Sequence, residues 1–414
     1  MKHGTIIQCK KLKPIEWMYL LMVVGMAIAP NTIIGYFFCI CFIGYIAWLN
    51  KGKFKTSLYF FIELVMILYL VIQLFIGINY EKAQFTGIRL LIISLVFDFS
   101  LYQLITRCGI YRAADLYATG NIIGDLILLA FYSGTIFHEG GLSASQFKGI
   151  SLFKIGGVAS VNIGWVNVVA IVLLWPNYLK FRDKNTLLKI GVLLLFSILT
   201  GRRKIFLLII TSLIIGTYLF YSSMGLKKAI KGIAMGGVAV LIGWILLMKV
   251  PTLYNFIGYR LQVALEAVLR SNNGTDSSIN MRNELAEKAI YAWKNNIYLG
   301  QGYNAFSAVY NGGGYYSHNN YYELLVSFGV VGTAIYYAKY VFIFVKLLAS
   351  KIQKRIQQWD NIYYIINLIA FCFLEYYQIT YIYRNLTVIL IFALYVANNG
   401  IDAVSYTHLT LPTN

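Results

Sequence analysis

The sequence has 414 residues, of which 59% are hydrophobic and 12% are charged, and its formal net charge is +19. Soluble domains are about 45–50% apolar and about 25% charged, so this chain has too few charges to cover a water-facing surface. Its lysines lie in short clusters between apolar runs, which favours anionic lipid and membrane topology over nucleic acid as the reason for the charge. We therefore predict an integral membrane protein and no nucleic-acid partner.

Apolar runs recur along the whole chain, and a transmembrane helix needs about 20 such residues. We predict an all-α polytopic membrane protein of about twelve transmembrane helices, with one large extracytoplasmic loop that contains short helices. The predicted organisation is N-terminal transmembrane helices in 1–249, the loop in 250–322 and C-terminal transmembrane helices in 323–399. The apolar runs are residues 15–29, 32–49, 58–78, 87–106, 121–137, 155–174, 187–199, 204–221, 230–248, 323–348, 362–381 and 386–397.

The ends of the chain need separate treatment. Three lysines precede the first run, but a second run follows at once and no small-residue cleavage site is present, so we predict an uncleaved first span. Residues 404–414 resemble a translated adapter scar, and we expect a non-native tail there. The five cysteines include none in the large loop, and we predict neither a disulfide framework nor a metal site.

Positive residues predict the orientation of the spans. They cluster at the N-terminus and in alternate loops near 51–55, 107–112, 180–184, 227–231 and 351–355, which places both termini and these loops in the cytoplasm. The turn with Arg202, Arg203 and Lys204 then faces outward, against the usual bias. Either a span is miscounted, or this turn is a cationic site that holds an anion, because arginine donates paired hydrogen bonds to phosphate.

The large outer loop contains the candidate chemistry. Residues 282–293 have Leu285, Ala289 and Trp293 on one helical face, and Asn280 is placed to cap that helix. A glycine run at 312–314 follows. The next span is then preceded by a polar segment whose candidate functional residues are His318, Asn319, Asn320 and Glu323.

Three segments, in order, resemble the superfamily of O-antigen ligases and of O-antigen, capsule and exopolysaccharide polymerases. Residues 199–204 resemble its turn that ends in Ser-Arg, with Arg203 in the arginine place and Arg202 replacing the serine. Residues 282–306 resemble its Arg…Trp…Gly-x-Gly…Phe segment, with Gly300 and Gly302 as the glycine pair. Residues 318–332 resemble its His-Asn motif.

The resemblance implies inverting glycosyl transfer from a polyprenyl-pyrophosphate-linked oligosaccharide at the outer face of the bacterial cytoplasmic (inner) membrane, without cofactor or metal. Arg203 and Arg282 would stabilise the pyrophosphate leaving group, and His318 would orient the acceptor hydroxyl or take its proton. We expect Arg202, Arg260, Gly300, Gly302, Asn319, Asn320 and Glu323 to bind the pyrophosphate or glycan. Membrane lipids, a flippase and chain-length regulator proteins are the expected partners.

Three other functions stay open at this level. A ligase of the same superfamily would transfer a glycan to a lipid or protein acceptor, and the motifs are shared. A flippase of lipid-linked oligosaccharide would have two related halves with short loops, and no half-repeat is evident. A non-catalytic assembly partner leaves the outer arginines unexplained. Among charges within spans, which are functional candidates, Glu375 is predicted to lie toward the outer end of its helix and to face the cavity of the candidate site.

Overall fold

The structure is a computed structural model that describes residues 12–28, 33–77, 81–138, 159–199, 203–251, 277–310, 316–352, 358–376, 379–381 and 387–399, together with residues 254 and 262. These residues form helices joined by turns and contain no β-strand. The predicted all-α fold is therefore confirmed for the described chain. Arg202, Arg260, the glycine run at 312–314 and the tail at 404–414 lie outside it.

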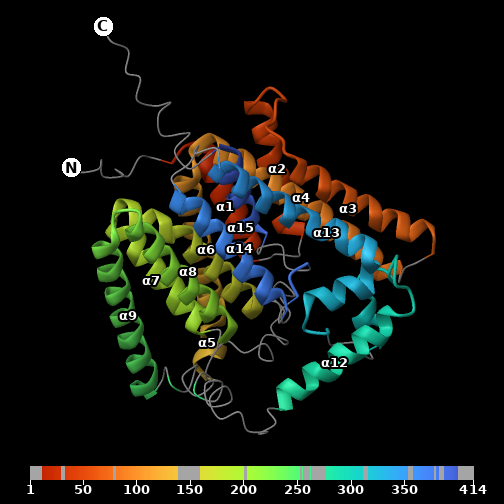
Figure 1. Cartoon of the computed structure of the whole chain (residues 1–414). Coiled ribbons are helices and arrows are strands. Elements are labelled where there is room, and N and C mark those ends of the chain that lie inside the picture. Colours follow the sequence, from red (N-terminus) through yellow and green to blue (C-terminus); the bar gives the residue numbers. More distant parts are fainter. Residues whose placement is uncertain are drawn as a thin grey trace.

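Each of the twelve predicted apolar runs coincides with a helix (Figure 1). Among the described residues, two further elements, helix α12 and a short π-helix, lie between α9 and α13, in the segment predicted to be the large loop. The helices are α1 (Pro14–Ile28), α2 (Ile33–Leu49), α3 (Leu58–Phe75), α4 (Glu81–Cys108), α5 (Ile110–His138), α6 (Ala159–Phe181), α7 (Lys184–Leu199), α8 (Arg203–Ser222), α9 (Leu226–Lys249), α12 (Ser277–Trp293), η3 (Phe306–Tyr310), α13 (Asn320–Ile352), α14 (Gln358–Glu375) and α15 (Val388–Asn399).

Four described helical segments are long and apolar enough to cross a membrane, and they are Leu58–Phe75, Ala83–Cys108, Ile110–Phe131 and Asn320–Ser350. Shorter apolar helices include Pro14–Ile28 and Val388–Asn399. The chain is thus a helical membrane protein, whereas the crossing of all twelve helices, the domain boundaries and the sidedness of the termini stay predictions.

Several predicted boundaries are wrong, because an apolar run and a backbone helix end for different reasons. Helix α5 begins at Ile110, about three turns before the predicted start, and α14 ends at Glu375, before the predicted 381. A backbone helix continues through polar turns that an apolar run does not include, and it stops where other hydrogen bonds replace its own. Asn280 likewise lies inside α12, which begins at Ser277, and so does not cap it.

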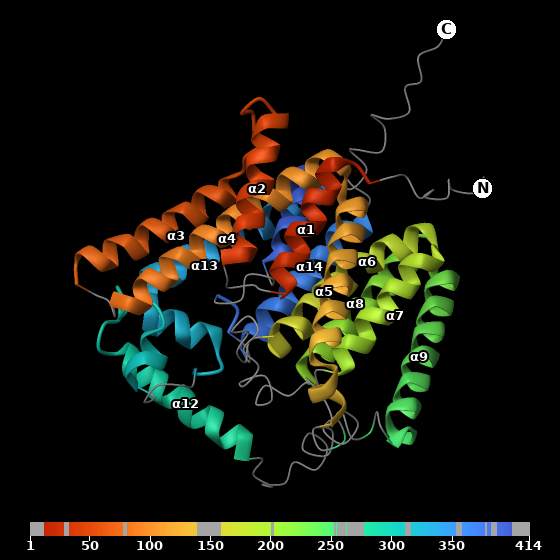
Figure 2. The ribbon, with the colours of Figure 1, turned by 180° about the vertical axis from the view of Figure 1, so that it is seen from behind.

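The helices form two flanks around a middle layer. In both views α3, α4 and α13 lie on one side and α7, α8 and α9 on the other, with α14 between them (Figures 1 and 2), and Figure 1 shows α15 next to α14. Helix α15 packs on both α4 and α13, and its residues from Val388 to Val396 are buried. Helix α12 packs against α13 at one end of this bundle.

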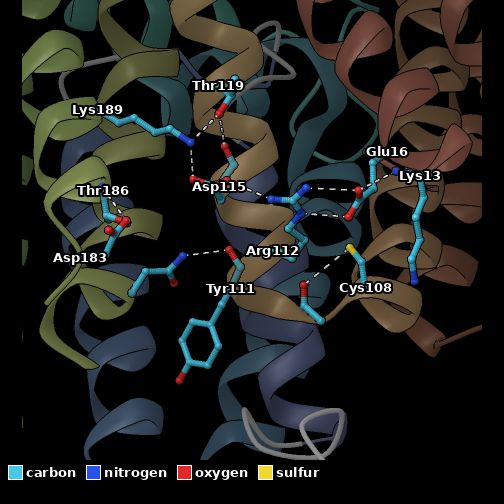
Figure 3. A network of polar contacts seen from close by, with 12 residues as sticks. Lys13, Glu16, Cys108, Tyr111, Arg112, Asp115, Thr119, Asp183, Thr186 and Lys189 are labelled. Carbon is cyan, nitrogen blue, oxygen red and sulfur yellow. Dashed lines mark hydrogen bonds and ion pairs between the residues drawn. The ribbon is translucent and has the colours of Figure 1, made fainter. Parts of the chain in front are cut away.

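Ion pairs join α1, α5 and α7 (Figure 3). The Arg112 guanidinium lies between two carboxylates, 2.8 Å from Glu16 and 3.5 Å from Asp115. Asp115 also pairs with Lys189 of α7. Because each of these charges has an opposite charge as neighbour, this network is a structural junction and offers no anion site.

A buried ion pair ties α3 to α13. The Lys339 ammonium lies 2.5 Å from a Glu63 carboxylate oxygen, and the two side chains are 6% and 3% exposed. The hydroxyls of Tyr59 and Thr387 donate to nearby Asp98 at 3.0 and 2.8 Å. These contacts fix the middle of α13 against α3, α4 and α15, and thereby position the end of α13 where the candidate site lies.

Candidate functional site

The polar segment before α13 folds into a tight turn. The Asn319 side-chain oxygen accepts hydrogen bonds from the backbone amides of Tyr321 and Tyr322 at 2.9 and 3.2 Å, so Asn319 caps the helix. The Glu323 carboxylate reaches back to the Ser317 amide at 2.6 Å. The Ser317 hydroxyl donates to the Asn319 carbonyl at 3.0 Å.

His318 lies between Ser317 and Asn319 in this turn. Its backbone is left-handed, with φ of 57°, a conformation that costs a residue with a Cβ about 1–2 kcal/mol. The turn's hydrogen bonds on either side impose it. The imidazole is half-buried, and its ring centroid is 6.4 Å from that of Tyr316, with the two rings perpendicular. Strain of this kind gathers at functional sites because surrounding structure must hold it in place.

Glu323 is completely buried beneath the same turn. One of its carboxylate oxygens accepts the Ser317 amide, and the other has no hydrogen-bond partner among the described residues. A buried carboxylate oxygen without a partner is costly, so Glu323 is the described group of this turn with unused capacity to accept a proton or a hydrogen bond.

Asn320 connects the turn to the segment that follows α14. Its side-chain oxygen accepts from the amides of Thr380 and Tyr381 at 2.9 and 3.1 Å, and its amide donates to the Tyr337 hydroxyl at 3.2 Å. The structure thus gives Asn319 and Asn320 positional roles, and their contact with substrate stays a prediction.

Glu375 is the hub of the neighbouring network. Its carboxylate accepts from the hydroxyls of Tyr337 and Tyr340 at 2.7 and 2.9 Å and from the Thr380 hydroxyl at 2.5 Å. Glu375 is buried and lies at the C-terminal end of α14. Glu375 is therefore linked to the turn through Tyr337, which also bonds to Asn320, and its predicted position beside the cavity of the site stays a prediction.

Helix α13 is broken at Gly329, where the backbone has φ of 62°. The predicted Gly-x-Gly segment crosses this break. The amides of Gln301 and Gly302 donate to the carbonyls of Val326 and Ser327 at 2.8 and 2.9 Å. From the other side of the break, the amides of residues 330 and 331 donate to the carbonyls of residues 297 and 298 at 2.9 and 3.1 Å. The segment thereby satisfies backbone groups that the break removes from the helix.

The glycines of this contact touch backbone to backbone. A Cβ added at Gly300 would lie 2.4 Å from the Gly329 nitrogen, and one added at Gly329 would lie 2.3 Å from the Tyr298 carbonyl oxygen. The amides of Gly300 and Gly302 are both used within the protein. We therefore assign these glycines a structural role, and their predicted part in binding substrate stays a prediction.

Polar residues of α3 and α4 clamp the same segment. The Tyr69 hydroxyl donates to the Leu299 and Phe328 carbonyls at 2.9 and 2.7 Å, and Gln73 donates to the Leu299 carbonyl at 2.6 Å. The Gln84 side chain accepts from the Tyr303 amide at 2.7 Å. Sequence reasoning missed these residues, although a glutamine inside an apolar run is a signal of a buried partner.

Arg282 lies on α12 and is half-buried. One turn further on, Leu285 packs with Phe306, Val326 and Tyr322, so the predicted apolar face of α12 is confirmed and rests against the start of α13 and η3. The opposite face is solvated, because Glu284 and its neighbour Lys288 are exposed. A hydrogen bond of 2.6 Å from Lys288 holds the pKa of the Glu284 carboxyl below its usual value.

Arg203 begins α8, and its place follows from the register of α8 against α14. The Ser212 hydroxyl donates to Asn367, and one turn further along α8 a Cβ on Gly216 would meet the Tyr363 ring. The two helices are therefore antiparallel, and the same register brings residue 203 level with residue 376. The start of α8 thus lies at the end of the bundle where Glu375 supports the His318 turn.

This region is similar to a known protein family. Residues 188–337 match the O-antigen ligase family. The match confirms the resemblance to the O-antigen ligase and polymerase superfamily. No curated protein matches the chain.

The O-antigen ligase match covers about a third of the chain, from α7 into α13. It contains every predicted site residue, from Arg202 to Glu323. It also contains the segment that crosses the break at Gly329. The chain is therefore a helical membrane protein whose matched segment indicates glycan transfer of the ligase or polymerase type, with lipid-linked oligosaccharides as the implied substrates.

Proposed function

We propose that this protein polymerises lipid-linked oligosaccharide repeat units into a surface polysaccharide. The reaction is inverting glycosyl transfer from a polyprenyl-pyrophosphate donor at the outer face of the bacterial inner membrane. His318, Arg203 and Arg282 form its catalytic group, and no metal takes part. Arg202 and Arg260 assist in holding the pyrophosphate.

The main support for this proposal is that separate parts of the matched segment meet at one end of the bundle. The His318 turn and α12 pack around one apolar cluster that includes Leu285 and Tyr322, and the register of α8 brings the start of that helix to the same end. Arginines from two separate helices and a strained histidine suit a reaction whose leaving group gains negative charge.

These groups account for the bond that forms, the bond that breaks and the proton that is released. The acceptor hydroxyl oxygen forms a bond to the donor sugar C1 as the bond from C1 to the phosphate oxygen breaks, so the sugar configuration inverts. The hydroxyl proton passes to the imidazole of His318. Glu323 lies five residues away, one of its carboxylate oxygens has no partner among the described residues, and it is the alternative acceptor of that proton. The guanidinium groups of Arg203 and Arg282 stabilise the pyrophosphate that leaves.

The test is transfer by the purified full-length protein in detergent, with a polyprenyl-pyrophosphate oligosaccharide as donor and with EDTA present. Products longer than two repeat units support a metal-independent polymerase. A single transfer to a lipid or protein acceptor, without chain growth, identifies the ligase that the matched family's description suggests. Movement of the donor across a vesicle bilayer without any new glycosidic bond identifies the flippase and contradicts the proposal.

A further inference from the structure

A polar cavity lies far from the candidate site. Its volume is about 480 Å³, within the usual range of about 300–1,000 Å³ for ligand sites. Lysines and asparagines from three parts of the chain line it, together with the start of α3. The lining residues are Lys55, Thr56, Ser57, Leu58, Tyr102, Phe342, Lys346, Asn398 and Asn399.

This cavity lies at the opposite end of α13 from the His318 turn. Lys346 follows the break at Gly329 by 17 residues on that helix, which is roughly 26 Å at about 1.5 Å per residue. The hydrocarbon core of a bilayer is about 30 Å thick. The cavity therefore lies near the membrane surface opposite to the candidate site, at the ends of the spans α3, α4 and α13.

The positive charge of the lining suits an anionic ligand. Lys55 and Lys346 supply two cations, and the described lining residues include no carboxylate to neutralise them. The Ser57 hydroxyl is buried and has no hydrogen-bond partner among the described residues, although Ser57 stands at the start of α3 where such a hydroxyl usually caps the helix. A phosphate oxygen would satisfy both the hydroxyl and the lysines.

The lining is also held in place without a ligand. The backbone of Lys55 makes two hydrogen bonds to the Gln103 side chain, at 3.2 and 2.7 Å. The Lys346 ammonium donates to Asn398 at 2.7 Å, and Asn398 donates to the Tyr102 hydroxyl at 3.1 Å. A site organised in this way loses little freedom when an anion binds.

Exposed apolar side chains continue from the cavity along two helices. Leu58 and Phe61 of α3 are 53% and 60% exposed, and Val341 and Val345 of α13 are 60% and 55% exposed. Such a surface accommodates acyl chains. We propose that this cavity binds the phosphate headgroup of an anionic phospholipid at the membrane face opposite to the glycan-transfer site.

Native mass spectrometry of the full-length protein in detergent tests this site, with phosphatidylglycerol, phosphatidylcholine and soluble glycerol phosphate as probes. We expect selective binding of phosphatidylglycerol. Each lysine near an anionic headgroup contributes about fivefold, so the Lys55→Gln, Lys346→Gln double variant should bind about 25-fold more weakly.

Lys51→Gln with Lys53→Gln is the matched control, because it removes the same amount of charge from the exposed loop that contains Lys55 without touching the cavity. It should weaken binding less than twofold. Equal weakening in both double variants overturns the site, and equal binding of glycerol phosphate overturns its assignment to a lipid. Should the Lys346 variant fail to fold, Lys55→Gln alone still predicts a fivefold loss, and Lys346→Arg predicts retained binding.

Discussion

A methyl group added at Gly300 tests whether the Gly-x-Gly segment supports the candidate site through the break in α13. The new Cβ would lie 2.4 Å from the Gly329 nitrogen and 2.5 Å from the Phe328 nitrogen. Both are backbone atoms, so no side chain can turn away to make room. The backbone of Gly300 is also left-handed, with φ of 71°, and alanine is strained there.

The expected cost follows from these contacts. The left-handed conformation costs alanine about 1–2 kcal/mol. Displacement of the segment breaks the hydrogen bonds from Gln301 and Gly302 to the opened turn of α13, each of which contributes about 0.5–1.5 kcal/mol. Gly300→Ala should therefore destabilise the protein by about 2–5 kcal/mol. With an unfolding entropy of about 2.1 cal/mol/K per residue, Tm falls by roughly 2–6 °C.

The assay is thermal unfolding of the purified protein in detergent, followed by transfer activity on the same preparation. Gly191→Ala is the control, because that glycine lies in α7 with no atom within 4 Å of its added Cβ, and alanine favours a helix there by about 1 kcal/mol. If Gly300→Ala matches the control in Tm and activity, the segment does not close the break as described.

Other substitutions test the parts around this contact, each by thermal unfolding in detergent. Asn319→Ala removes the cap of α13 and should cost about 1 kcal/mol, whereas Asn319→Asp should keep the cap; equal stability of the two would contradict capping. His318→Gly relieves a left-handed backbone and should not lower Tm, while transfer falls about 10²–10³-fold; retained transfer would remove His318 from the catalytic group. Lys339→Met leaves Glu63 buried without its cation and should cost about 3–5 kcal/mol, most of which the added change Glu63→Gln restores; no recovery would show that the ion pair is not the cause.

Much of the fold was predictable because hydrophobic length and helical period are local properties. Every apolar run coincides with a helix, and the apolar face of α12 was identified from Leu285 and Ala289. The cap at Asn319 was not predicted, although asparagine before an apolar helix is a common start signal, and the same signal predicted a cap at Asn280, which lies inside α12.

The support of the site was not predictable from local patterns. The contact between Gly300 and Gly329 joins residues 29 positions apart, and the clamp from Tyr69 comes from a helix more than 200 residues earlier. Glutamines and tyrosines within apolar runs have many possible partners, so their hydrogen bonds become evident only when the packing of α3 against α13 is known. The partner of Glu63 was missed for the same reason.

In the proposed catalytic group, His318, Arg203 and Arg282 act together at one end of the bundle. The most direct test is the rate of chain growth by three purified alanine variants, one for each of these residues, with Arg89→Ala as control because that arginine is exposed and lies outside the matched segment. We predict a loss of about 10²–10³-fold in each site variant with Tm unchanged, and no loss in the control. Full activity in the three site variants would contradict the account.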